Sequence, residues 1–307
     1  MSMESRKILG VRVDFGLSVE EVLNMIESNF LTDKKNHIIC TTNPEFIMDA
    51  QKDEEFKEII NKSSLSVPDG IGVIFAKKFL DKVEKLNRKN IFFPIIAFFS
   101  GILLGFHGRS FREERVSGVD LVDAICKLSS ERGYSIFFLG GRGRKAVSKM
   151  YIGNDKRGNE LDVSTQAAEI MRKKYPGVNI IGATSKYNRG SEDDEKTVNF
   201  IKNVMEEKGV KRVDFLFVAY NHNYQEKWIM RNKDKIPAKI SIGCGGAFDF
   251  IVGNCSLPTD FYVKNNLEWL YRLIKQPWRF KRVIKAFPLF PIKLFLSTMT
   301  LSNNDCK

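Results

Sequence analysis

The sequence is poor in the residues that build metal centres and disulfide frameworks. It has 3 histidines and 5 cysteines in 307 residues, and no two cysteines are spaced as a CxxC pair. This pattern argues against a zinc site. An odd number of scattered cysteines is typical of a reducing compartment rather than of a secreted protein.

Other signatures are also missing. No two aspartates stand two positions apart, so the sequence has no DxD motif that could hold a metal-bound diphosphate. Any nucleotide-sugar chemistry would therefore need arginine, lysine and backbone N–H groups to stabilise the diphosphate. The glycine-rich turns do not match GxGxxG, and no Walker lysine follows them, which disfavours dinucleotide-binding and P-loop proteins. The first residues lack the apolar core of a signal peptide, so we expect a cytoplasmic protein.

Basic residues outnumber acidic ones. There are 49 Lys+Arg against 37 Asp+Glu, a net charge of +12, which predicts a polyanionic partner: nucleic acid, an anionic membrane or a phosphorylated substrate. With 43% hydrophobic residues, the chain can build the core of one large α/β domain or of two small ones.

Short apolar runs alternate with amphipathic segments along most of the chain. A strand-like stretch runs from Ile8 to Phe15, and further strands are predicted at His37–Thr41, Leu65–Val67, Ser135–Leu139, Val178–Ile181, Val213–Ala219 and Lys239–Gly243. Helices are predicted at Val19–Phe30, Glu45–Asn61, Gly70–Phe79, Val119–Arg132, Thr165–Lys174, Glu192–Lys208 and Gln225–Lys235. This order predicts an α/β fold: a Rossmann-like, mostly parallel sheet with helices on both faces. Ligands bind such sheets where the strands end and the helices begin.

The alternation predicts an α/β core over residues 1–255 and a basic, helical C-terminal appendage over 256–307. Two insertions interrupt the core, near 88–112 and 151–164. The first contains Ile91–Phe106, which has no charged residue. Sixteen helical residues span only about 24 Å, less than a membrane crossing needs. We interpret the run as dipping into one leaflet; a buried core helix or a protein contact is the alternative.

The appendage combines positive charge with aromatic residues. Between Lys264 and Phe295 there are 8 basic residues and 1 acid, more than half of the net charge of the whole chain. Basic, aromatic helices lie in membrane interfaces, and each Lys or Arg contributes on the order of 1 kcal/mol near an anionic leaflet. RNA binding is the alternative. The Phe287–Pro291 stretch favours a membrane, and we expect no nucleic-acid partner.

Two polar segments follow predicted strands and open helices. Asn43 could cap the helix that follows it, or its segment could bind an anion or a sugar. Asp69 lies in a Pro-Asp-Gly turn, where an aspartate stabilises a helix start whatever its function. Asp69 would, however, lie at the same sheet edge as Thr41 and Asn43, and a carboxylate there could accept a proton from an attacking hydroxyl.

Two glycine turns occupy equivalent positions after later strands. Gly140 and Gly141 begin one turn, and Gly246 lies in the other, which ends in Asp249. Glycine lets a ligand approach the backbone closely, and the aspartate could accept a hydrogen bond from a ribose or a base. Plain turn formation is the alternative for both.

Eight segments in order resemble the WecG/TagA/CpsF family of bacterial glycosyltransferases. They are TTNPEFIMDAQKDEEF, VPDGIGV, ERVSGVDL, FFLGGRG, KKYPGVNIIG, YQEKWI, GCGGAFDFIVG and LEWLYRLIKQPWRFKR. The resemblance implies transfer of an N-acetylmannosamine-type sugar, without a metal or other cofactor, from a UDP donor. The acceptor it implies is an undecaprenyl-diphosphate-linked amino sugar at the inner face of the membrane, in cell-surface polysaccharide or teichoic acid synthesis.

The resemblance also implies roles for individual residues. Asp69 would be the general base. Thr41, Asn43 and Gln225 would line the sugar and diphosphate pocket, and Asp249 with its glycine turn would contact the nucleotide. Four arginines would stabilise the charge of the leaving group: Arg115, Arg272, Arg279 and Arg282. The basic appendage would bind the membrane and close over the site, where it would exclude water.

The sequence departs from the family between Ala219 and Tyr224, where a loop with Gly and Pro is usual. The bulkier residues here leave the identity of the donor sugar open. Two other functions stay open as well: a nucleotide-dependent oxidoreductase, and a non-enzymatic module that binds membrane or RNA. A homo-oligomer is compatible with the sequence.

Overall fold

The computed structural model describes residues 3–106, 114–141, 162–253, 268–275 and 280–300, and the single positions 259, 262 and 277. For Phe106, Glu268, Trp269 and Arg272 it describes the backbone alone. Most of the insertion predicted at 151–164, and part of the predicted appendage, lie outside these residues.

A parallel sheet of six strands forms the centre of the molecule, in the order β4-β3-β8-β7-β5-β6. Its strands are β3 (His37–Thr42), β4 (Leu65–Pro68), β5 (Ile136–Gly140), β6 (Ile180–Thr184), β7 (Val213–Ala219) and β8 (Ala238–Gly243). The predicted α/β class and the mostly parallel sheet are confirmed.

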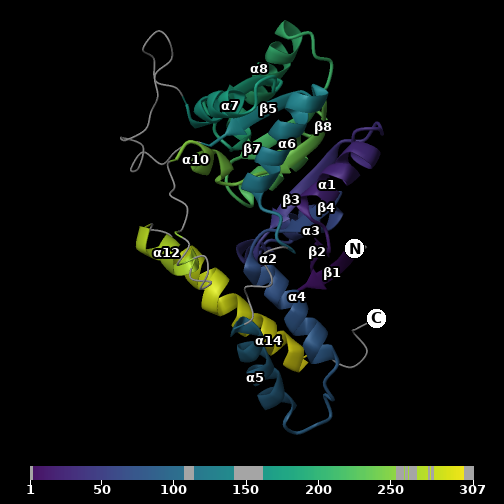
Figure 1. The fold of residues 1–307 in the computed structure, drawn as a ribbon, viewed down its shortest axis with the longest axis vertical. Coiled ribbons are helices and arrows are strands. Elements are labelled where there is room, and N and C mark those ends of the chain that lie inside the picture. The colour runs from purple at the N-terminus through teal and green to yellow at the C-terminus, as the bar shows by residue number, and fades with distance from the viewer. Residues whose placement is uncertain are drawn as a thin grey trace.

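Helices cover both faces of this sheet (Figure 1). One face packs against α2 (Pro44–Ala50), α3 (Glu54–Lys62), α4 (Ile71–Glu84), α8 (Asp194–Glu207) and α9 (Tyr224–Asn232). The other packs against α1 (Val19–Met25), which continues as the π-helical turn η1 (Ile26–Phe30), and against α6 (Gly118–Arg132), α7 (Val163–Lys174) and α10 (Ala247–Ile251). A short 3₁₀ turn, η4 (Ser191–Asp193), precedes α8.

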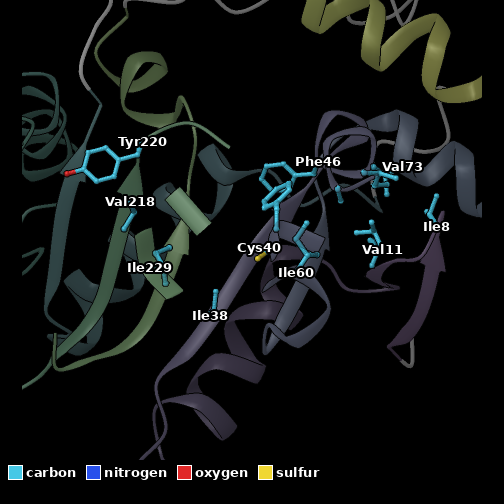
Figure 2. Close-up of a cluster of buried hydrophobic side chains, with 14 of the residues drawn as sticks. Ile8, Val11, Ile38, Cys40, Phe46, Ile60, Val73, Val218, Tyr220 and Ile229 are labelled. Atoms are coloured by element: carbon cyan, nitrogen blue, oxygen red, sulfur yellow. The ribbon is translucent and has the colours of Figure 1, made fainter. Parts of the chain in front are cut away.

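The hydrophobic core therefore has two layers, one on each side of the sheet. Because both faces are covered, the residues of β3 and β5 are all buried, and these strands have continuous apolar runs rather than alternation. Figure 2 shows part of the first layer, where Cys40 of β3 lies among side chains of the neighbouring helices such as Phe46 and Ile60.

The strand-like stretch from Ile8 to Phe15 is the turn and second strand of a hairpin. Strands β1 (Glu4–Ile8) and β2 (Val11–Phe15) pair antiparallel across a turn in which Leu9 and Gly10 have φ of 49° and 79°. Asp14 attaches the hairpin to the main sheet, because its carboxylate accepts from the backbone N–H of Ser66 at 2.8 Å.

The helix predicted over Glu45–Asn61 is two helices, α2 and α3. Asp53 caps the second, since its carboxylate accepts from the N–H of Phe56 at 3.1 Å. A capping side chain gives the chain a place to start a new helix. The amphipathic pattern continues across the break because both helices face the same core layer.

Strands β3 and β8 are neighbours in the sheet, but the helices that follow them lie on opposite faces. Phe46 of α2 belongs to one core layer, whereas Phe248 of α10 belongs to the other. A parallel sheet opens a ligand-binding crevice where successive connections diverge in this way. The carboxyl ends of β3 and β8 therefore locate the candidate site.

Four further helical segments lie outside this arrangement: α5 (Phe93–Phe106), α12 (Glu268–Lys275), α13 (Phe280–Ile284) and α14 (Phe290–Thr300), with η6 (Lys285–Leu289) joining the last two. Figure 1 shows α5 and α14 beside the lower half of α4, away from the sheet. Among the described residues, Phe280–Thr300 alone is long and apolar enough to cross a membrane by those two criteria. Phe287 has extended backbone (φ −158°, ψ 122°) and breaks this stretch into two helices.

Candidate active site at the carboxyl ends of the strands

Asp69 lies directly after β4, at the carboxyl edge of the sheet. Its backbone N–H donates to the carbonyl of Thr42 at 2.8 Å, which holds the turn after β4 against the end of β3. A Cβ on Gly72 would lie 2.8 Å from the ring of Pro44, so the start of α4 packs closely against the start of α2. Half-buried Asp69 therefore lies in a turn beside the start of α2.

Thr41 and Asn43 bracket the end of β3. The hydroxyl of Thr41 donates to the carbonyl of Gly243 at 3.1 Å, so it ties β3 to the end of β8. The Asn43 side chain accepts from the N–H groups of Glu45 and Phe46 at 2.9 and 3.1 Å. Asn43 is thus the N-cap of α2, and its carboxamide stands at the same edge as Asp69.

Arg115 reaches this edge although 45 residues separate it from Asp69 in the sequence. The N–H of Val116 donates to the carbonyl of Pro68 at 3.0 Å, which places the chain before α6 beside the turn that holds Asp69. A Cβ on Gly118 would lie 3.1 Å from the carbonyl oxygen of Cys244, so α6 begins close to the turn after β8.

Gln225 and Glu226 begin α9 and lie beneath the turn after β8. The side-chain oxygen Oε1 of Gln225 accepts from the backbone N–H of Gly245 at 2.9 Å, and the side-chain nitrogen Nε2 of Gln225 donates to the carboxylate of Glu226 at 2.7 Å. Glu226 also accepts from the N–H of Asn223 at 2.8 Å. Both side chains are buried, and a Cβ on Gly243 would lie 2.5 Å from each. This carboxylate and carboxamide fix the loop after β7 against the turn after β8.

Glu226 was not among the residues proposed from the sequence. Its burial raises the pKa of the carboxyl to about 7. Two buried thiols lie near it, and burial likewise raises the pKa values of Cys40 and Cys244, so both stay protonated. The only sequence signal for Glu226 is its place directly after Gln225 at a helix start.

The two glycine turns differ in their surroundings. Gly140 and Gly141 have φ of 90° and 78°, and a Cβ on either would lie 3.0 Å or less from Tyr220 or Phe248. Packing therefore explains these two glycines. A Cβ on Gly246, in contrast, would meet none of the described residues within 4 Å. Gly246 is half-buried, and half-buried Asp249 lies beside it on the first turn of α10.

Arg282 connects the C-terminal helices to this edge. Its guanidinium donates to Glu45, on the first turn of α2, at 2.6 Å, and lies 3.2 Å from the Nδ1 atom of His222. The other ring nitrogen of His222 lies 2.8 Å from Asp49, which also pairs with Lys285. Burial alone would raise the pKa of Asp49, but the hydrogen bonds from His222 and Lys285 lower it below its usual value.

Two predicted arginines lie outside this description. Arg272 belongs to α12, but its side chain is outside the described residues, and Arg279 is outside them altogether. The structure thus brings together the ends of β3, β4 and β8 with Arg115, Gln225 and Arg282. It places Gly140 and Gly141 at the end of β5, where they pack against protein atoms.

Within the described part of the chain, no group of three or more His, Cys, Asp or Glu side chains is arranged to hold a metal ion. The edge can supply a carboxylate at Asp69, cations at Arg115 and Arg282, and a half-buried glycine backbone at Gly246. This combination suits an anionic substrate that must lose a proton from a hydroxyl group.

A model of the glycosyl transferase WecG/TagA/CpsF family matches residues 6–99 and 95–304, nearly the whole chain. The chain belongs to this family. It is therefore a glycosyltransferase, and neither the oxidoreductase nor the non-enzymatic module suggested as alternatives by the sequence agrees with this membership.

Relatives from several bacteria are similar along most of their length. The chain is 26% identical to a Bacillus subtilis protein over 264 residues. The matched region covers 85% of this chain and 80% of that protein. A Bacillus spizizenii protein is 23% identical over 84% of this chain and 79% of its own length. A Staphylococcus aureus protein is 25% identical over 94% of this chain and 91% of its own length. Each is named an N-acetylglucosaminyldiphosphoundecaprenol N-acetyl-beta-D-mannosaminyltransferase.

Proposed function

We propose that this WecG/TagA/CpsF glycosyltransferase moves an N-acetylmannosamine-type sugar from a UDP donor to an undecaprenyl-diphosphate-linked amino sugar. The names of the relatives support the sugar and the acceptor lipid. We place the reaction at the cytoplasmic face of the membrane, in the synthesis of a cell-surface polysaccharide or teichoic acid.

The convergence of strand ends around Asp69 carries this proposal. Hydrogen bonds tie the turn that holds Asp69 to the ends of β3 and to the segment of Arg115. In the proposed step, Asp69 accepts the proton of the acceptor hydroxyl as its oxygen bonds to the anomeric carbon of the donor. The bond between that carbon and the diphosphate oxygen breaks, and UDP leaves with the electron pair.

The leaving diphosphate needs positive charge close by. The segment of Arg115 lies at the sheet edge beside the turn of Asp69. Arg282 of α13 lies near the same edge, because its guanidinium donates a hydrogen bond to Glu45 at the start of α2. Helix α4 begins at Ile71 after the N-cap residue Gly70, which provides no capping side chain, so the first amides of this 14-residue helix can face an anion. These groups would stabilise the developing charge without a metal.

The donor nucleotide fits the turn after β8 best. Gly246 leaves room above its backbone, and Asp249 stands one turn into α10, where it can accept from a ribose hydroxyl or a base. Gln225 is buried, and its side chain holds this turn in place by accepting a hydrogen bond from the N–H of Gly245. In this proposal Gln225 shapes the pocket, and Gly246 and Asp249 touch the nucleotide.

The test is Asp69→Asn, compared with Asp234→Asn, which changes an exposed aspartate after α9. Transfer of labelled N-acetylmannosamine from its UDP donor to the lipid-linked acceptor should fall by about 10²–10⁴-fold in the first variant, the usual contribution of a general base. The control should retain wild-type turnover, and the affinity of Asp69→Asn for UDP should be unchanged.

Near-normal turnover of Asp69→Asn would reject the general-base role. The absence of transfer by the wild-type protein from any UDP-sugar would reject the proposed function as a whole.

A further inference from the structure

A polar cleft opens next to the catalytic edge, between the end of α2 and the loop after β7. Its volume is about 470 Å³, within the range of roughly 300–1,000 Å³ that is usual for small-molecule sites. The walls come from the turn between α2 and α3, the loops after β6 and β7, and α13. Of the described residues that the sequence proposed for the site, Arg282 alone lines this cleft. The cleft therefore has no assigned ligand.

The two carboxylates that line the cleft are neutralised by lysines that do not line it. Asp49 pairs with Lys285 of η6. Asp53 pairs with Lys227 of α9 at 2.8 Å, and its carboxylate also accepts from the side-chain amide of Asn223 at 3.2 Å. Because both acids already have cationic partners, they present little uncompensated negative charge to a ligand.

Two cations of the cleft have no acidic partner of their own. Arg282 donates to Glu45 at 2.6 Å, so its charge is matched. Arg189 and Lys52 are both exposed, and neither forms an ion pair with any residue that the structure describes. A cleft with cations of this kind attracts an anion, and phosphate oxygens are common partners of arginine.

Arg189 is exposed, yet its contacts hold it in place. Its guanidinium lies 3.4 Å from the centroid of the Tyr224 ring and donates to the carbonyl of Tyr220 at 3.4 Å. Its own carbonyl accepts from Arg231 at 3.4 Å, and Arg231 pairs with Asp194. A guanidinium that is fixed before the ligand arrives loses less conformational freedom when it binds an anion.

The loop after β7, which leads directly to Tyr224, has a strained backbone. Asn221 and Asn223 have φ of 68° and 71°. With a ψ of −49°, Asn223 lies close to a γ-turn geometry that is rare and strained. Hydrogen bonds to Glu226 and Asp53 hold Asn223 there. Strain of this kind persists only where the surrounding structure fixes it, and it is concentrated at functional sites.

The cleft and the turn after β8 belong to opposite faces of the sheet. Helices α2 and α9 pack on one face, whereas α10, which follows that turn, packs on the other. In the proposed one-step displacement, the attacking oxygen and the leaving diphosphate lie on opposite sides of the anomeric carbon. With the donor nucleotide at the turn after β8, the acceptor would enter from the side of the cleft. From Asn43 to Asp49, α2 spans about 9 Å, a distance that an amino sugar and its phosphate can bridge.

We propose that this cleft binds the diphosphate group of the lipid-linked acceptor, with Arg189 and Lys52 as its cationic ligands. This assignment rests on the proposed function, which names that acceptor. Arg189 and Lys52 hold the acceptor, while Asp69 accepts the proton from its hydroxyl. Because they bind substrate and take no part in bond cleavage, their loss affects the KM for the acceptor rather than kcat. The donor UDP also has a diphosphate, so the test must separate the two substrates.

The test compares two double variants that each lose two positive charges. The first carries Arg189→Gln and Lys52→Gln; the control carries Lys127→Gln and Lys202→Gln, which change exposed lysines on α6 and α8. Isothermal titration measures the affinity of each protein for UDP and for a water-soluble acceptor, N-acetylglucosaminyl diphosphate attached to a farnesyl chain. All four side chains are exposed, so folding should be retained, as circular dichroism and thermal unfolding will check.

We expect the first variant to bind the farnesyl acceptor at least about tenfold more weakly than the wild type, because it loses two charge-assisted contacts. Its KM for this acceptor should rise by a similar factor, whereas kcat at saturating acceptor and the affinity for UDP should match the wild type. The control should match the wild type in every measurement.

A loss of UDP affinity with unchanged binding of the farnesyl acceptor would assign the cleft to the donor and overturn the proposal. Unchanged affinity for both ligands, or an equal loss in the control, would also overturn it. Titration needs no turnover, so the two proposals fail separately. A wild type that transfers no sugar rejects the proposed function, whereas weaker acceptor binding by the first variant still supports the assignment of the cleft.

Discussion

Glu226 brings a carboxyl group into the protein interior, where two N–H donors and little else can solvate it. The Gln225 side-chain amide and the Asn223 backbone N–H donate to its two oxygens. Sequence patterns could not single out this residue, because a glutamate at a helix start is usually an exposed capping residue. Its burial depends on contacts with Gly243 at the end of β8, the next element in the chain, and such a contact between elements leaves no local sequence pattern.

The raised pKa of Glu226 makes stability depend on pH in a definite direction. The folded protein keeps a proton at Glu226 up to about pH 7, whereas the unfolded chain releases it near 4.5. Protonated Glu226 therefore makes its full contribution to the free energy of unfolding below pH 4.5, and this contribution is lost as pH rises through about 7. Glu226→Gln stays neutral throughout, so the stability of the wild type relative to this variant should fall between about pH 5 and about pH 8.

Urea unfolding of the two proteins at both pH values measures this difference. Glu169→Gln, which changes an exposed glutamate on α7, is the control and should show no such trend. A wild type that gains stability relative to Glu226→Gln as pH rises would contradict the assignment of the raised pKa.

Two glycines, one at the end of β8 and one in the turn after it, lead to opposite predictions for stability. Gly243→Ala places a Cβ 2.5 Å from Gln225 and Glu226, which hydrogen bonds hold in place, so we expect a loss of about 1–3 kcal/mol in the free energy of unfolding. Gly246→Ala meets no described residue within 4 Å and has a φ of −91°, so its stability should be close to wild type. Its affinity for UDP should nevertheless fall if the nucleotide approaches this backbone.

Urea unfolding and isothermal titration with UDP separate these two effects. Wild-type UDP affinity in a folded Gly246→Ala protein would remove the turn after β8 from the nucleotide site.

At the scale of elements, local patterns predicted the strands well and the ends of helices less well. Strand Val213–Ala219 has the predicted bounds, because it is buried on both faces and ends at polar residues. The break between α2 and α3 was missed, since both helices turn their apolar residues to the same core layer. The role of Arg115 in stabilising the leaving group was predicted from family resemblance alone and stays a prediction, since no local pattern reports the hydrogen bond between Val116 and Pro68 that brings its segment beside Asp69.

The start of α2 allows the two interpretations of Asn43 to be separated. Asn43→Ala removes a cap with two hydrogen bonds and should cost about 1 kcal/mol of unfolding free energy. Asn43→Asp keeps an acceptor oxygen in the same place and should restore stability. If Asn43 also contacts the substrate, Asn43→Asp will remain impaired in transfer although its stability is normal.

Thermal unfolding and transfer assays on both variants provide the measurements. Full activity in Asn43→Asp would leave capping as the sole role of this side chain.

At the scale of the whole molecule, the charge balance predicted a polyanionic partner and the alternation of segments predicted an α/β fold. The parallel sheet confirms that fold class. The division into a core of residues 1–255 and an appendage stays a prediction. The structure adds that Arg282 and Lys285, within the predicted appendage, pair with acids of α2, a contact that no sequence pattern specifies. Charge on the appendage therefore serves contacts within the protein as well as any contact with lipid.

A UDP site should stabilise the whole fold by mass action. UDP at 100 times its dissociation constant should add about 2.7 kcal/mol to the free energy of unfolding and raise Tm by several degrees. NAD should leave Tm unchanged, because the glycine turns do not match a dinucleotide fingerprint. Differential scanning fluorimetry with a panel of UDP-sugars measures both; stabilisation by NAD and not by UDP would contradict the nucleotide assignment.

The place of β8 between β3 and β7 has a consequence for synthesis on the ribosome. Until Ala238–Gly243 has emerged, the β3–β4 pair and the β5–β6–β7 group have no strand to join them, and each presents an unpaired edge. Such edges invite pairing with other nascent chains. The hydroxyl of Thr41 also lacks its hydrogen-bond acceptor, the carbonyl of Gly243, until β8 has been made. Among the strands that the structure describes, β8 is thus the last to be made, and it completes the crevice proposed as the active site. We expect a chain stopped short of it to be inactive and prone to aggregate.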